Sequence, residues 1–81
     1  MREQRTQLAI ALGEEFVRRF PLEPDSVPNG LSAARLMDRL GRDEDARRLL
    51  VDLVRRFPQH PMRGELLAAL ETLEDAARRG T

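Results

Sequence analysis

The residues of this 81-residue chain that could carry out chemistry are few and scattered. There is one histidine, His60, which stands between Gln59 and Pro61, and there is no cysteine. Nucleophilic catalysis needs a serine or cysteine beside a base and an orienting carboxylate. The serines, Ser26 and Ser32, fall in a turn or at a helix start, where capping accounts for them. His60 is interpreted as a turn or capping residue, and we expect no enzymatic activity.

Three adjacent carboxylates, Asp43, Glu44 and Asp45, form the densest acidic cluster of the sequence. A calcium loop needs alternating oxygen ligands over about twelve residues with a glycine turn, which this cluster lacks. The cluster is interpreted as a helix start, because carboxylates stabilise the positive end of the helix dipole. The sequence therefore predicts neither a metal nor another cofactor, and the lack of cysteine excludes disulfides and thiolate metal sites.

The charge balance argues against a nucleic-acid partner. The chain carries 14 basic and 14 acidic residues, whereas nucleic-acid binders carry a positive excess that offsets the phosphates. No apolar run approaches the roughly 20 residues that span a bilayer, so direct membrane insertion is not expected. The first residues, MREQRTQ, do not resemble a signal peptide. We expect a cytoplasmic protein, with a periplasmic location or membrane association through a parent protein as the alternative.

A repeated phrase indicates how the elements are organised. The run FVRRFPLEP at positions 16–24 returns as LVRRFPQHP at positions 53–61, with six of nine residues identical, 37 residues later. Such a recurrence indicates one helical unit used twice in a stacked array. Arrays of this kind form extended surfaces that bind other molecules.

Hydrophobic periodicity and strong breakers predict an all-α fold. Pro21 and Pro58 each end a helix, and Gly41 is expected to close another in a left-handed conformation. Short connections force neighbouring helices to pack antiparallel, so we expect four antiparallel helices stacked as hairpins. The predicted helices cover residues 3–20, 27–40, 43–57 and 62–79 of a single domain that spans 1–81.

The segment LSAARLMDRLGRDEDARRLLVDLVRRFP, residues 31–58, resembles a tetratricopeptide repeat. That family places a small residue in the first helix, a glycine at the turn, an alanine early in the second helix and a closing proline. Here these positions hold Ala34, Gly41, Ala46 and Pro58. The resemblance implies one full repeat flanked by two half repeats, the first of which ends at Pro21.

Several features depart from the family's pattern. The period is 37 rather than roughly 34 residues, and the extra residues fit the proline-rich linker between Pro21 and Gly30. Gly30 and Gly64 stand where the family has a large aromatic residue. The FP endings are similar to divergent repeats of bacterial envelope and membrane-associated proteins. A plain four-helix bundle is the alternative architecture.

The resemblance also implies a ligand groove lined by the first helix of each hairpin. Arg35 and Arg39 are the residues expected to anchor an acidic peptide segment, although a solvated face is the ordinary interpretation of helical arginines. The expected groove residues are Arg35, Asp38, Arg39, Glu65 and Thr72.

The first and last helices are each half of a hairpin, and each is therefore expected to expose an apolar face. Because large exposed apolar patches are unusual in soluble monomers, we expect pairing into a homodimer, or a fragment cut from a longer array. The residues expected to mediate this self-association are Leu8, Leu12, Phe16, Leu66, Leu67 and Leu70.

The sequence as a whole favours a non-catalytic scaffold or assembly module. Such a module would bind a partner protein or peptide, or associate with itself. The alternative is a soluble regulatory domain of a larger bacterial membrane or envelope protein.

Overall fold

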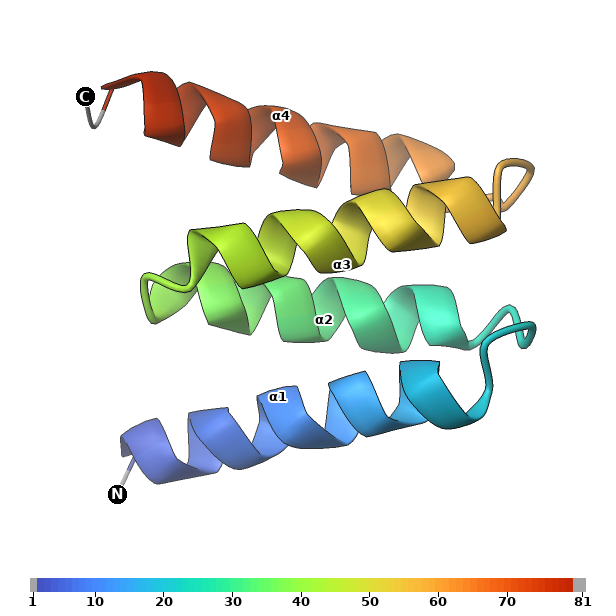
Figure 1. Cartoon of the computed structure of the whole chain (residues 1–81), viewed down its shortest axis with the longest axis horizontal. Coiled ribbons are helices and arrows are strands. Elements are labelled where there is room, and N and C mark those ends of the chain that lie inside the picture. The colour runs from blue at the N-terminus through green and yellow to red at the C-terminus, as the bar shows by residue number, and fades with distance from the viewer. Residues whose placement is uncertain (1, 80–81) are drawn as a thin grey trace.

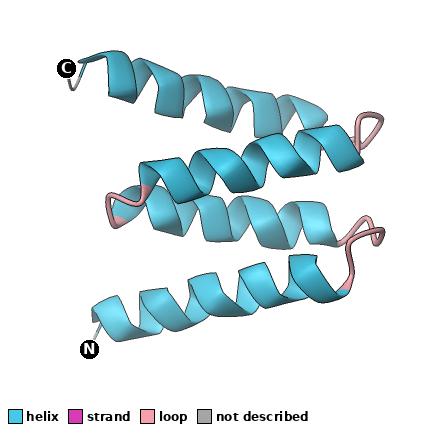
Figure 2. Cartoon of the chain, viewed as in Figure 1, coloured by secondary structure: helices cyan, strands magenta, loops and turns pink. Residues whose placement is uncertain are grey.

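The computed structural model describes residues 2–79, and this part of the chain is all-α, with four helices and no strand (Figure 2). Every helix end lies within one residue of its predicted position. Of the predicted domain, residues 1, 80 and 81 lie outside the described part. The helices are α1 (Arg2–Arg19), α2 (Ser26–Arg39), α3 (Asp43–Arg56) and α4 (Arg63–Arg79).

The four helices form a flat, open stack of antiparallel neighbours (Figure 1). The molecule measures 34 × 30 × 15 Å, so its thinnest dimension is little more than the diameter of one helix. Each helix packs on its neighbour in the chain, and α2 also contacts α4, whereas α1 contacts neither α3 nor α4. In a closed four-helix bundle the first and last helices meet, so the bundle alternative does not describe this chain.

Local chemistry sets the helix ends. Gly41 has a φ of 78°, the only positive φ in the described residues, and this conformation suits glycine because it has no Cβ. The Gly41 N–H donates to the Asp38 carbonyl at 3.0 Å, and the Arg42 N–H donates to the Met37 carbonyl at 2.8 Å. These two bonds form a Schellman motif, which satisfies the last carbonyls of α2. The predicted left-handed closure at Gly41 is confirmed.

The repeat in the sequence is also a repeat in the backbone. The connections 20–25 and 57–62 have equal length, and their hydrogen bonds recur with the same offset of 37 residues. The extra residues of the period therefore belong to the repeated unit and are not an insertion in the first linker. The matching bonds join Phe16–Phe20 and Leu53–Phe57, Phe20–Glu23 and Phe57–His60, and Glu23–Ser26 and His60–Arg63, at N···O distances of 2.9–3.2 Å.

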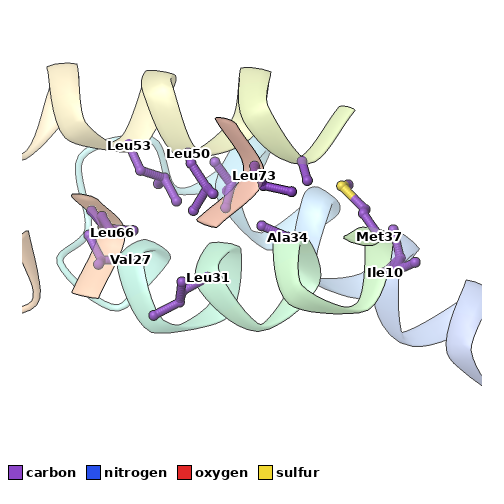
Figure 3. Close-up of a cluster of buried hydrophobic side chains, with 11 residues drawn as sticks. Ile10, Val27, Leu31, Ala34, Met37, Leu50, Leu53, Leu66 and Leu73 are labelled. Atoms are coloured by element: carbon purple, nitrogen blue, oxygen red, sulfur yellow. The ribbon is translucent and has the colours of Figure 1, made fainter. Parts of the chain in front are cut away.

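The hydrophobic core runs along the middle of the stack. Leu50 and Leu53 of α3 point toward α2, and Met37 lies with Ile10 of α1 at one end (Figure 3). Burial of such side chains is the main source of stability in a chain of this size. The buried apolar residues of this cluster are Ile10, Val17, Val27, Leu31, Ala34, Met37, Ala46, Leu50, Leu53, Leu66 and Leu73.

Close helix approach depends on two buried glycines. A Cβ built on Gly13 of α1 would lie 2.8 Å from the Ala33 Cβ and 3.0 Å from the Asn29 carbonyl oxygen of α2. A Cβ on Gly30 would lie 2.5 Å from Leu53 Cδ1. The position expected to hold a large aromatic residue at Gly30 is therefore filled from the neighbouring helix by Leu53.

Candidate functional site

A groove of about 250 Å³ lies between α2 and α4, with α3 beneath it. The helices α2 and α4, which form the two walls, contact each other only lightly, so their facing side chains do not fill the space between them. Small side chains from both walls keep it open. The lining residues are Ala34, Arg35 and Asp38 of α2, Leu50 of α3, and Glu65, Ala68, Ala69, Thr72 and Leu73 of α4.

The floor of the groove is apolar and part of the core. Leu50 is 1% exposed and Leu73 is 6% exposed, so these side chains are held rigidly by the packing beneath them. Ala69 is half-buried beside them. A ligand side chain in the groove would therefore replace water on a preformed apolar surface, which is favourable by the hydrophobic effect.

The rim of the groove carries three charged side chains. Among the described residues, Arg35 and Glu65 have no ion-pair partner, so both charges are available to a ligand. Partial burial raises the pKa of the Asp38 carboxyl, and the hydrogen bond with Asp43 and the negative charge of Asp43 raise it further. The Thr72 hydroxyl already donates to the Ala68 carbonyl at 3.0 Å, which leaves its oxygen as an acceptor.

Four of the five residues expected in the groove line it, namely Arg35, Asp38, Glu65 and Thr72. Arg39 does not line it, because it lies one residue past the end of the wall at Asp38 on the helix. The charged rim could be predicted from the sequence, whereas the floor residues Leu50 and Leu73 were not expected in the groove. The available signal for them was the run of small and apolar residues at helical spacing, such as Ala68 and Leu73.

A second candidate surface is an apolar stripe on α1, made of Leu8, Leu12, Phe16 and Phe20. Residues four apart lie on one helix face. Leu8, Leu12 and Phe20 are 60%, 63% and 46% exposed, and Phe16 is half-buried with its ring centroid 5.0 Å from that of Phe20. Phe20 was not among the residues expected here, although the four-residue spacing includes it.

The outer face of α4 corrects a prediction. Leu66 is fully buried and Leu70 is half-buried against the core, so the expectation that they form an exposed association face is wrong. Leu66 lies beside Val27 of α2 (Figure 3), and Leu70 packs against the core cluster that α4 shares with α2 and α3. Leu67 is 38% exposed. The other exposed residues of that outward face are small or polar and include Gly64, Ala68 and Glu71.

His60 has a structural role between two loops. Its Nδ1 accepts a hydrogen bond from the Met62 N–H at 3.0 Å, so its Nε2 carries the proton and donates to the Pro24 carbonyl at 3.1 Å. The Ser26 hydroxyl, fully buried, donates to the Phe20 carbonyl at 2.5 Å. The His60–Pro24 bond ties the connection 57–62 to the connection 20–25, and the Ser26–Phe20 bond closes the connection 20–25 on itself.

The acidic cluster at the start of α3 also has local partners. Glu44 pairs with Arg47 at 3.2 Å and Asp45 pairs with Arg42 at 3.1 Å. The hydrogen bond from Arg47 and its positive charge lower the pKa of Glu44. In residues 2–79 no group of histidine, cysteine or carboxylate side chains is arranged to hold a metal ion.

Within the described range, none of the helices has both the length and the apolar character needed to cross a membrane. A comparison with protein-family models, curated proteins and solved structures finds no match to this chain.

Proposed function

We propose that this chain is a non-catalytic, tetratricopeptide-like interaction module that binds an extended peptide in the groove between α2 and α4. One observation carries the proposal: side chains from three helices, 15 to 38 residues apart in sequence, meet around a preformed apolar hollow, as the lining residues Arg35, Leu50 and Leu73 illustrate. At about 250 Å³ the hollow is smaller than the roughly 300–1,000 Å³ of pockets that enclose small molecules. It is the right size for side chains of a bound peptide.

The charges of the groove decide which peptide it favours. Two carboxylates, Asp38 and Glu65, face one guanidinium, Arg35, so the rim is acidic overall. An acidic segment would meet repulsion at both carboxylates, and the interpretation of the groove as an anchor for acidic peptides gives way to the opposite charge. The favoured ligand places a leucine-sized side chain on the floor and a basic side chain on either flank. Arg35 then remains for a backbone carbonyl of the ligand.

The proposal is tested with two labelled peptides that differ only in their flanking charge. One carries a central leucine between lysines, and the other carries the same leucine between glutamates. Fluorescence polarisation should give tighter binding of the lysine peptide, by roughly 3–10-fold at low salt, because exposed charge contacts contribute about 0.2–1 kcal/mol each. The preference should shrink as salt screens the rim.

A blocking variant separates the groove from the rest of the surface. Ala68→Trp places a large side chain in the hollow from an exposed position and should abolish peptide binding while leaving the helical melt unchanged. Ala11→Trp adds the same side chain at an exposed position of α1 and serves as the matched control. Equal binding by both variants, or a preference for the glutamate peptide, would contradict the proposal.

A further inference from the structure

The apolar stripe on α1 has an equivalent that is already covered by a helix within the molecule. The backbone repeat relates the stripe, 37 residues on, to positions 45, 49, 53 and 57 of α3 and its end. There, Leu53 is fully buried under Gly30 of α2, and Leu49 and Phe57 pack against the core. Since α2 runs antiparallel to α3 (Figure 1), this face of the repeated helix is a surface on which an antiparallel helix packs.

Within residues 2–79, nothing covers the stripe itself. α1 contacts only α2, through a different face, where Ile10, Gly13 and Val17 are buried. Leu8 and Leu12 are left 60% and 63% exposed. Contiguous exposed apolar side chains with charges at their edges are typical of interaction sites.

The charges on the side of α1 that carries the stripe are mainly basic. At about 100° of rotation per residue, Arg5 projects between Leu12 and Phe16 around the helix axis. Glu3 and Glu14 project on the opposite side of the helix. An occupant of the stripe therefore meets a guanidinium beside the apolar side chains.

A difference between the two repeated helices leaves the charge of Arg5 available. Its equivalent on α3, Arg42, pairs with Asp45 at 3.1 Å. The position equivalent to Asp45 on α1 holds Leu8, so Arg5 lacks the carboxylate that its equivalent has. Among the described residues, Arg5 has no ion-pair partner.

The other end of the stripe also has an excess of positive charge. Glu15 accepts hydrogen bonds from Arg18 and, at 2.9 Å, from Arg19, so one carboxylate faces two guanidiniums. The charges near both ends of the stripe thus complement an acidic partner and repel a basic one.

A second copy of the chain does not match these features. Its own stripe carries the same positive charges. Its α4, the helix equivalent to α2, holds Leu67 at the position equivalent to Gly30. Leu67 would then meet Phe16, whereas in the covered pair a glycine meets Leu53. The occupant that matches is a helix of a different protein.

We propose that the α1 stripe binds an acidic amphipathic helix of a partner protein, which packs antiparallel to α1 as α2 packs on α3. A small residue of the partner lies opposite Phe16, as Gly30 lies opposite Leu53. Carboxylates beside its apolar face reach Arg5 and Arg19. The inference does not depend on peptide binding in the groove, which is lined by α2, α3 and α4 and not by α1.

Two labelled synthetic helices test the proposal. Each is an alanine-rich peptide of about 20 residues with leucines at three- and four-residue spacing, flanked by glutamates in one peptide and by lysines in the other. Fluorescence polarisation should show tighter binding of the glutamate helix, by roughly 3–30-fold at low salt, with the preference shrinking as salt is added. The groove should prefer lysine, so the two sites differ in the sign of their preference.

The apolar contact is tested by Leu12→Glu, which should weaken binding of the glutamate helix about 30-fold or more, because it sets a carboxylate against apolar and acidic groups. Leu12 is 63% exposed, so circular dichroism of the variant should keep the helical melt of the parent chain. Leu22→Glu makes the same change at an 84% exposed position in the α1–α2 connection and should bind as the parent does.

The charge contact is tested by Arg5→Glu, which should weaken binding of the glutamate helix roughly 3–10-fold and strengthen binding of the lysine helix. Arg55→Glu is the matched control, since Arg55 is an exposed arginine of α3 without an ion-pair partner among the described residues. It should leave both affinities unchanged. The groove variant Ala68→Trp should also bind the glutamate helix as tightly as the parent does.

Four results would overturn the inference. The first is no binding of the glutamate helix at millimolar concentration, and the second is equal affinity for the two helices. The third is loss of binding in Ala68→Trp, which would place the helix in the groove. The fourth is a light-scattering mass of twice the 9.3 kDa of one chain that falls to a single chain in Leu12→Glu, because a second copy would then occupy the stripe.

Discussion

At the scale of single residues, Asp38 sets the acidity of the groove wall. Its pKa is raised by partial burial and by Asp43, so the folded chain holds its proton more tightly than the unfolded chain. The stabilising contribution is thus complete below the ordinary value of 3.8 and is lost as the pH rises through the raised pKa. At neutral pH, the partial burial of the ionised Asp38 carboxylate and its repulsion from Asp43 therefore lower the free energy of unfolding.

Asp38→Asn should therefore stabilise the chain at neutral pH by about 0.3 kcal/mol, a gain kept small by solvent exposure. The gain in stability should vanish below pH 3.8.

Glu44→Gln should instead destabilise the chain at neutral pH and leave its stability unchanged at low pH. Because Arg47 lowers the pKa of Glu44, its contribution exists above 4.5 and disappears as the pH falls. Thermal melts of both variants across the acid range check the two signs, and parallel curves for the two variants would contradict them.

Glycine is required at Gly13 by space, whereas Gly64 has no such requirement. A Cβ at Gly13 would press on the backbone oxygen of Asn29, which a rotamer change cannot relieve, but a Cβ at Gly64 meets nothing within 4 Å. Gly13→Ala should cost about 1–3 kcal/mol through overpacking. Gly64→Ala should stabilise α4 by up to about 1 kcal/mol, since alanine loses less backbone entropy in a helix.

Chemical denaturation of both glycine variants measures this difference directly. We expect the denaturation midpoint of Gly13→Ala to fall below that of the parent chain and the midpoint of Gly64→Ala to rise above it. A Gly13→Ala variant as stable as the parent would mean that α1 and α2 can move apart without loss, and the close approach of the two helices would then have no energetic weight.

At the scale of elements, His60 joins the connection 57–62 to the connection 20–25. Its Nε2 donates to the Pro24 carbonyl across the two connections, and its Nδ1 accepts from the Met62 N–H, which fixes the ring in place. His60→Ala should cost about 1–2 kcal/mol, since each hydrogen bond contributes about 0.5–1.5 kcal/mol. Gln59→Ala, one residue earlier and exposed, should change the melting temperature little. Equal effects of the two substitutions would show that the bridge does not stabilise the stack.

The helices themselves could be predicted from the sequence because their signals are local. Proline at 21 and 58, glycine at 41 and apolar spacing along each segment act within a few residues, and the boundaries agree with the structure to one residue. The side of α4 that faces α3 could not be predicted in the same way. Its leucines at 66, 67, 70 and 73 spread over about 120° of the helix circumference, and only packing decides that Leu66 is buried and Leu67 partly exposed.

The candidate groove shows the same division between local and long-range information. Arg35, Asp38, Glu65 and Thr72 were expected because each lies on the first helix of a hairpin. The depth of the groove depends instead on how far α2 and α4 stand apart, which the spacing of residues within one helix does not encode. Arg39 illustrates the limit, since it lies next to Asp38 in sequence and yet outside the wall.

At the scale of the whole molecule, the open stack divides stability unevenly. The middle helices α2 and α3 each have a neighbour on both sides, whereas α1 and α4 each pack mainly on one helix. In stacked arrays, stability is approximately the sum of each unit and its interfaces with its neighbours. A defect in the middle should therefore affect every helix, and a defect at an edge should stay local.

Leu53→Asp and Leu66→Asp test this division with one substitution, because both leucines are fully buried. Leu53 lies in α3, and an unpaired carboxylate there should abolish the cooperative helical melt, since burying a charge is severely costly. Leu66→Asp should detach α4 and remove roughly a quarter of the helical signal, the share held by its 17 residues. Hydrogen exchange should then be fast in α4 and still slow in α2. Loss of all helicity in both variants would mean that the four helices fold as one unit, because only then does a defect at the edge of the stack reach its middle.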